Sequence, residues 1–194
     1  FGNVFSAHAA QLMGLPIKDL HIATNENDTL NQIIQFGQMK INNVKETYSP
    51  SMDIQVSSNF ERQIYESMNQ NSEDVKNIMK DFNDTKNYQF NSEALKKFQN
   101  IYNSTSISNE KTIQTIRLFN EKYNYLADPH TATGLSILSD KGGNLDHPLI
   151  SLACAHPAKF GDAINRAIGE EPPFPEDLEN IFDKSEKMTI LSNS

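Results

Sequence analysis

The sequence predicts an α/β fold in which the strands of a parallel sheet alternate with helices. Near the start of the chain, a helical stretch, the short apolar run LHIAT and a second helical stretch follow one another. The same alternation returns near the end, where the apolar run LISLACA precedes a segment with helical periodicity. Strands that alternate with helices are typical of parallel sheets. At 194 residues the chain is long enough for a sizeable core, and we expect residues 1–194 to form one domain.

The first predicted elements have well-marked ends. Apolar residues on one helical face predict a helix over residues 3–13, and Gly14 stands at its C-terminal end. LHIAT at residues 20–24 is short, apolar and followed by polar NEND, which is typical of a buried strand that opens into a loop. One residue of the Asn-Asp pair 27–28 is expected to cap a second helix, which Gly37 closes.

The middle of the chain changes character and predicts a helical insert over residues 58–124. This region is rich in Asn, Lys, Ser and aromatic residues, and narrow apolar stripes recur along it at helical spacing. Ser58 and Glu61 match a capping box, so a helix is expected to begin there. We expect the helices to pack at the edge of the sheet through the stripe residues Val75, Ile78, Met79, Phe82, Leu95, Phe98, Ile113, Ile116, Phe119 and Tyr123.

The last third of the chain returns to the α/β pattern. An Asp-Pro pair begins a predicted helix over about residues 128–138, and KGGNLDHP at 141–148 is expected to be a turn. LISLACA at 149–155 predicts a fully buried strand. A helix over about 156–169 should follow, and EEPPFPEDL at 170–178 should be an extended connector into a last short helix or tail.

Composition narrows the classes of function. The net charge is −8, from 17 Lys and Arg against 25 Asp and Glu, and no basic patch opposes it, which argues against a nucleic-acid partner. No apolar run approaches the ~20 residues that cross a bilayer, so no membrane is expected. Cys154 is the single cysteine, which suits a reducing compartment such as the cytoplasm. The histidines and this cysteine lack the spacing of a metal site, so no metal is expected.

Candidate binding residues are expected in the loops beyond the carboxyl ends of the strands. FGN at the start of the first helix could be an anion site or only a capped helix start. Cys154 near the end of its strand could be a functional thiol or a small core residue, and it lies too close to His156 in sequence to favour a Cys-His hydrolase. His156 and Lys159 could hold an anion, or could cap a helix and face solvent. His130 in a first helical turn has no explanation from capping.

Five segments, read together, resemble the threonine synthase family: FGN, ATNEND, SPSMDIQVSSNFER, DPHTATG and ACAHPAKF. They occur in the family's order across essentially the whole chain, and SPSMDIQVSSNFER is the most specific of them. Members of the family convert O-phospho-L-homoserine and water to L-threonine and phosphate with pyridoxal 5′-phosphate. The resemblance implies fold type II of the pyridoxal-phosphate enzymes, with residues 1–194 as the C-terminal portion of the catalytic domain.

The resemblance also implies which residues face the cofactor. In the family a Gly-rich loop, (T)GNFGN, holds the cofactor phosphate, and its last three residues match Phe1, Gly2 and Asn3. Cys154 matches a position where the family usually has Thr, whose hydroxyl meets the pyridine nitrogen. The lysine that forms the Schiff base lies upstream of the loop in the family, so no catalytic residue is assigned here and the chain alone is expected to be inactive.

Four further residues match family motifs: Asn59, Arg62, His130 and Lys159. Our hypothesis is that some of them hold the phosphate of O-phospho-L-homoserine or order the site, and Arg62 suits a bidentate phosphate contact best. The expected partners are this substrate and the N-terminal part of the same enzyme, without which an open apolar face predicts self-association. The alternatives are another fold type II lyase, or a stand-alone, non-catalytic domain that binds the cofactor or a partner chain.

Overall fold

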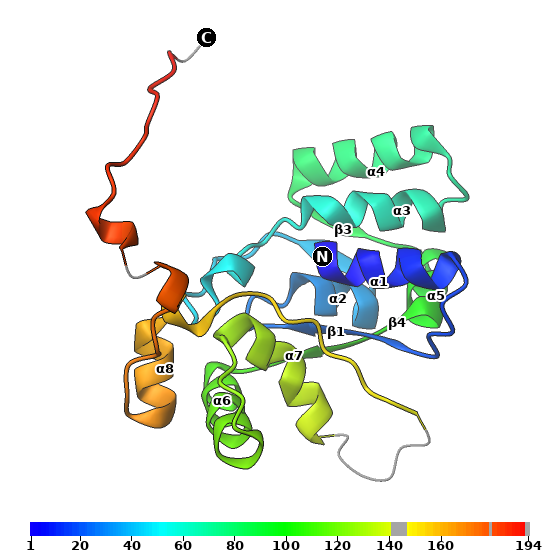
Figure 1. The fold of residues 1–194 in the computed structure, drawn as a ribbon. Coiled ribbons are helices and arrows are strands. Elements are labelled where there is room, and N and C mark those ends of the chain that lie inside the picture. Colours follow the sequence, from blue (N-terminus) through cyan, green and yellow to red (C-terminus); the bar gives the residue numbers. More distant parts are fainter. Residues whose placement is uncertain (141–146, 179, 193–194) are drawn as a thin grey trace.

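The computed structural model describes residues 1–140, 147–178 and 180–192 (Figure 1). Its α-helices are α1 (Gly2–Leu12), α2 (Thr29–Phe36), α3 (Glu61–Ser67), α4 (Ser72–Thr85), α5 (Ser92–Ile101), α6 (Asn109–Tyr123), α7 (Pro129–Asp140) and α8 (Gly161–Ile168). Its strands are β1 (Leu20–Thr24), β2 (Gln38–Lys40), β3 (Asn87–Gln89) and β4 (Tyr102–Ser106). Short 3-10 helices are η1 (Pro50–Met52), η2 (Ser58–Phe60), η3 (Pro157–Lys159), η4 (Glu176–Leu178) and η5 (Ile181–Asp183).

A parallel pair of strands, β1 and β4, confirms the predicted α/β class. The register runs from Leu20 opposite Tyr102 to Thr24 opposite Ser106. A separate antiparallel pair joins β2 to β3. Both β3 and β4 lie within residues 58–124, so the prediction of a purely helical insert is wrong at these two strands. The sequence YNSTS of β4 is polar, and hydrogen bonding to β1 rather than an apolar run makes it a strand.

Aromatic rings fill the core beside this sheet. The Phe98 side chain on α5 is 0% exposed, and its ring centroid lies 5.3 Å from that of Phe60 and 5.1 Å from that of Phe90. The Phe60 ring also meets the Phe1 ring edge-on, at 5.2 Å between centroids. The core therefore reaches the N-terminal end of α1 directly, and a second core lies between α6, α7 and α8.

Most helix ends in the first half agree with the sequence-based expectations. α1 and α2 occupy the predicted positions, and Gly37 closes α2 with φ of 71°, a left-handed conformation that glycine adopts without strain. Asp28 stands at the N-cap of α2, but its side chain accepts from Gln32 instead of capping the backbone. The capping box of Ser58 and Glu61 is wrong, because η2 occupies the turn and α3 begins only at Glu61.

The expected buried strand at residues 149–155 is also wrong. α7 begins at Pro129 as predicted, and α8 follows the 3-10 helix η3, but the segment between them is an extended chain without strand pairing. Ile150 is 80% exposed, so this apolar segment is not covered by other described residues. Most of the turn expected at 141–148 lies outside the described residues.

The C-terminal segment leaves the body of the structure. Figure 1 shows the segment after α8 turning back beside α8 as far as η4, and the chain from η5 onward running away from the helices. Among its described residues, this segment contains only the short helices η4 and η5. It agrees with the extended connector that the sequence predicts. Within the described ranges, none of the helices has the length and apolar character needed to span a bilayer.

Candidate functional site

The N-terminal end of α1 has features that suit an anion. Within the described residues no side chain caps it, and its first turn contains no acidic residue. The first backbone N–H groups of a helix have no acceptor within the helix, and the helix dipole places partial positive charge there. A capping side chain would occupy these N–H groups, and an acidic residue would neutralise the partial positive charge. This end of α1, which carries Gly2 and Asn3, therefore has the properties of a phosphate site.

Asn3 and Cys154 meet at this end of α1. The Asn3 Nδ2 atom lies 3.5 Å from the Cys154 Sγ atom, although 151 residues separate them in sequence. The surrounding protein atoms and the nearby Asp128 charge both raise the pKa of the Cys154 thiol. The sulfur is therefore held as a neutral thiol near neutral pH, a weak donor and acceptor rather than a thiolate.

Asn59 and Arg62 also lie near the first turns of α1. The Asn59 amide is in van der Waals reach of Gly2: a Cβ added there would be 3.8 Å from the Asn59 Nδ2 atom. The Arg62 guanidinium lies 6.0 Å from the centre of the Phe5 ring and has no hydrogen-bond or ion-pair partner among the described residues. Both side chains line an open groove of about 710 Å³. An unpaired guanidinium beside a helix N-terminus suits an anionic ligand.

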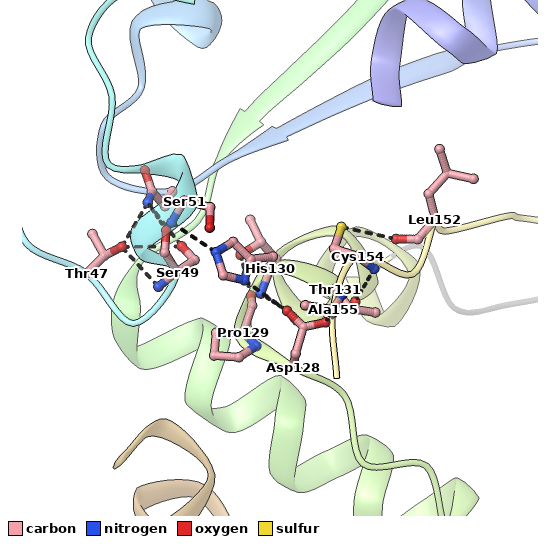
Figure 2. A network of polar contacts seen from close by, with 12 residues as sticks. Thr47, Ser49, Ser51, Asp128, Pro129, His130, Thr131, Leu152, Cys154 and Ala155 are labelled. Atoms are coloured by element: carbon pink, nitrogen blue, oxygen red, sulfur yellow. Dashed lines mark hydrogen bonds and ion pairs between the residues drawn. The ribbon is translucent and has the colours of Figure 1, made fainter. Parts of the chain in front are cut away.

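His130 and Lys159 occupy different environments. The two ring nitrogens of His130 are both engaged inside the protein, one by Asp128 and one by the Ser51 backbone (Figure 2). This favours an ordering role for His130 over direct contact with a substrate. Lys159 is exposed at the end of η3, and no contact joins its ammonium to Asn59 or Arg62 within the described residues. His156 caps η3, since its Nδ1 accepts from the Ala158 N–H at 3.1 Å.

A second polar cluster, which sequence reasoning did not assign, joins the loop after β1 to the residues around η1. The Asp53 carboxylate is its centre and accepts from the amides of Asn25 and Asn27 at 2.8 and 3.0 Å. It also accepts from the Thr47 hydroxyl at 2.6 Å and from the Thr47 N–H at 2.9 Å. Asn25 and Asn27 fall in ATNEND and Asp53 in SPSMDIQ, whereas Thr47 lies just before the second segment. No local sequence pattern indicates these contacts. No group of three or more metal-ligating side chains occurs in the described ranges.

Comparison with known proteins identifies the family. The family model described as "Threonine synthase, C-terminal" matches residues 131–194. The threonine synthase of Pseudomonas aeruginosa is 33% identical over 194 residues, which is 100% of this chain and 41% of that protein. Over its whole length, the chain matches the C-terminal part of threonine synthases. The threonine synthase of Saccharomyces cerevisiae is also 33% identical, and the match includes 100% of this chain and 42% of that protein.

Solved threonine synthases share the fold. A pyridoxal-phosphate-bound threonine synthase from Brucella melitensis superposes with a TM-score of 0.90 and 36% identity, over 98% of this chain and 41% of that one. The yeast threonine synthase structure gives a TM-score of 0.87 and 32% identity, over 96% of this chain and 41% of that one. The chain thus spans about 41% of the length of these relatives.

Proposed function

We propose that this chain forms the C-terminal part of a threonine synthase that converts O-phospho-L-homoserine and water to L-threonine and phosphate with pyridoxal 5′-phosphate. The family relationship supports this reaction. The structural observation that carries it is the meeting of Asn3 and Cys154 at the uncapped N-terminus of α1. Residues 151 positions apart in the sequence thus form one wall of a site for an anionic group.

The residues at this end of α1 fit the cofactor. Backbone N–H groups at Gly2 and Asn3, with the Asn3 amide, provide donors for its phosphate. The neutral Cys154 thiol provides a weak partner for the ring nitrogen and carries no charge that would stabilise a pyridinium. When bound, pyridoxal 5′-phosphate supplies an electron-withdrawing ring that stabilises negative charge developing on the substrate. The chain's contribution is to hold the phosphate and to place an uncharged group at the ring nitrogen.

We assign Asn59 and Arg62 to holding the phosphate of the substrate. Their position beside the phosphate-binding end of α1 supports this role, as does the lack of a protein partner for the Arg62 guanidinium. We assign His130 to ordering the site, because its ring nitrogens are engaged within the protein. We also propose Lys159 as a substrate-binding residue, because it lies in the family motif ACAHPAKF.

Replacing Arg62 by Ala in the complete protein that carries this chain should raise the KM for O-phospho-L-homoserine by roughly 10- to 100-fold. A charge-assisted, bidentate contact contributes about 1.5–3 kcal/mol, which is lost with the guanidinium. Steady-state measurement of phosphate release gives KM and kcat separately. Arg62→Lys should recover only part of the loss, because lysine restores the positive charge but not the planar guanidinium that makes two parallel hydrogen bonds.

Arg166→Ala is the matched control, since Arg166 is an exposed arginine in the last turn of α8. It removes the same charge from the same protein and should leave KM unchanged. An unchanged KM in Arg62→Ala would remove Arg62 from the substrate site.

The chain alone is proposed to be inactive. It spans about 41% of the length of its relatives, and the family resemblance assigns the cofactor-binding lysine to the remainder. The rest of the site would therefore come from the part of the protein that corresponds to the preceding sequence of the relatives.

A further inference from the structure

Asp128 is a buried carboxylate at the start of α7. Its side chain is 0% exposed, and within the described ranges no lysine or arginine pairs with it. A buried carboxylate without a cation is costly unless hydrogen-bond donors surround it. Burial by itself would raise the pKa of Asp128, but hydrogen bonds from His130, Thr131 and Ala155 hold that pKa below its ordinary value. The group is therefore a fixed negative charge whose partners are all protein donors.

One carboxylate oxygen, Oδ1, holds His130. It accepts from the His130 backbone N–H at 2.9 Å and lies 2.9 Å from the Nδ1 atom of the ring. The other ring nitrogen, Nε2, accepts from the Ser51 backbone N–H at 3.1 Å. A nitrogen that accepts from an N–H carries no proton, so the imidazole is neutral with its proton on Nδ1. Through this ring, Asp128 is connected to the segment around η1.

The other carboxylate oxygen, Oδ2, holds the segment that carries Cys154. It accepts from the Thr131 hydroxyl and from the Ala155 N–H, the latter at 3.2 Å. The Thr131 Oγ1 atom in turn accepts from the Cys154 N–H at 2.8 Å. Residues 149–155 have no strand partner, so these contacts take the place of a β-ladder there. Figure 2 shows both connections meeting at Asp128.

We propose that Asp128 is a positioning residue that fixes two parts of the site at once, His130 with the η1 segment through Oδ1 and Cys154 through Oδ2. The proposal rests on the proposed function, because it gives Cys154 its place beside Asn3 and the cofactor ring. Local helix capping needs only one oxygen of Asp128. Here each oxygen leads to a different distant segment. Through His130, Oδ1 is connected to Ser51, which lies 79 residues before His130 in the sequence. Through Thr131, Oδ2 is connected to Cys154, which lies 23 residues after Thr131, and this division points beyond capping.

Asp128→Asn in the complete protein, loaded with cofactor, tests the proposal. An amide has one acceptor oxygen and one N–H₂ group, so it can satisfy one pair of donors but not both. We expect kcat for O-phospho-L-homoserine to fall by roughly 10- to 100-fold through misplacement of the ring partner. The KM should change less, because Arg62 is not part of this network. Asp84→Asn, an exposed carboxylate on α4, is the control that removes the same charge.

Two further readouts separate positioning from a general loss of stability. In ¹⁵N NMR of the wild-type protein, the His130 signals should show a protonated Nδ1 and an unprotonated Nε2. The His130→Gln variant lacks these signals and so assigns them to His130. Hydrogen exchange should accelerate in Asp128→Asn at the Ser51 amide, or at the amides of Cys154 and Ala155, or at both. Exchange elsewhere in the core should stay as in the wild type.

Thr131→Val gives a test that does not depend on folding of the Asp128 variant. It should accelerate exchange at Cys154 and lower kcat, leave the Ser51 amide and the His130 tautomer unchanged, and be rescued by Thr131→Ser. Wild-type kcat in Asp128→Asn or in Thr131→Val would overturn the proposal, as would a proton on Nε2 of His130. If the wild-type protein does not turn over O-phospho-L-homoserine, the proposed function fails. Exchange and NMR then still decide whether Asp128 holds the two segments.

Discussion

Replacing Phe98 by Ala is expected to lower the free energy of unfolding of the chain by about 3–5 kcal/mol, because it deletes a fully buried ring and leaves a cavity. The rings of Phe60 and Phe90 both pack against the Phe98 ring, so both lose that contact. Urea unfolding followed by circular dichroism measures the change. The loss should also reach the site, since Phe60 supports Phe1 at the start of α1.

Phe36→Ala serves as the control for this substitution. Phe36 is 62% exposed at the end of α2, so its removal should change the free energy of unfolding by no more than about 0.5 kcal/mol. Equal effects of the two substitutions would mean that Phe98 is not at the centre of the core.

Replacing Asp53 by Ala is expected to lower the free energy of unfolding by roughly 2–4 kcal/mol. The substitution removes the acceptor of the Thr47 N–H and of the Thr47 hydroxyl. It also takes one acceptor from the side-chain amides of Asn25 and Asn27, which keep others nearby. Buried donors left unpaired cost about 1–3 kcal/mol each, reduced where water can enter. Urea unfolding of the chain measures this loss.

Asp53→Asn should cost less than Asp53→Ala, because it keeps one acceptor oxygen. Asp19→Ala, at an exposed carboxylate just before β1, should have almost no effect. If Asp53→Ala were as stable as Asp19→Ala, the Asp53 cluster would not hold the η1 segment to the loop after β1.

Sequence patterns predicted the elements whose ends are marked by local chemistry. α1 and α2 follow from apolar spacing and from glycines in left-handed conformations, and β1 follows from its short apolar run. β4 was missed because its sequence is polar and its strand conformation depends on pairing with β1, about 80 residues away. Residues 149–155 were misjudged for the opposite reason: they are apolar, but no described strand pairs with them.

The candidate site was only partly predictable for the same physical reason. Family motifs indicated Asn3, Cys154 and Arg62, but not that Asn3 and Cys154 touch, because no local pattern encodes a contact across 151 residues. Asp128 was interpreted as a helix cap, which is its local role. Its contacts with the Cys154 segment exist only in the folded chain, where α7 is brought against residues 152–155.

The central claim is that this chain carries one wall of a threonine synthase site and needs the rest of the enzyme for turnover. The most direct measurement is the release of phosphate and L-threonine from O-phospho-L-homoserine in the presence of pyridoxal 5′-phosphate, by the complete protein and by the 194-residue chain alone. The account predicts equal amounts of the two products from the complete protein and neither product from the chain. It would be contradicted by turnover with the chain alone, or by a complete protein that binds the cofactor and leaves O-phospho-L-homoserine intact.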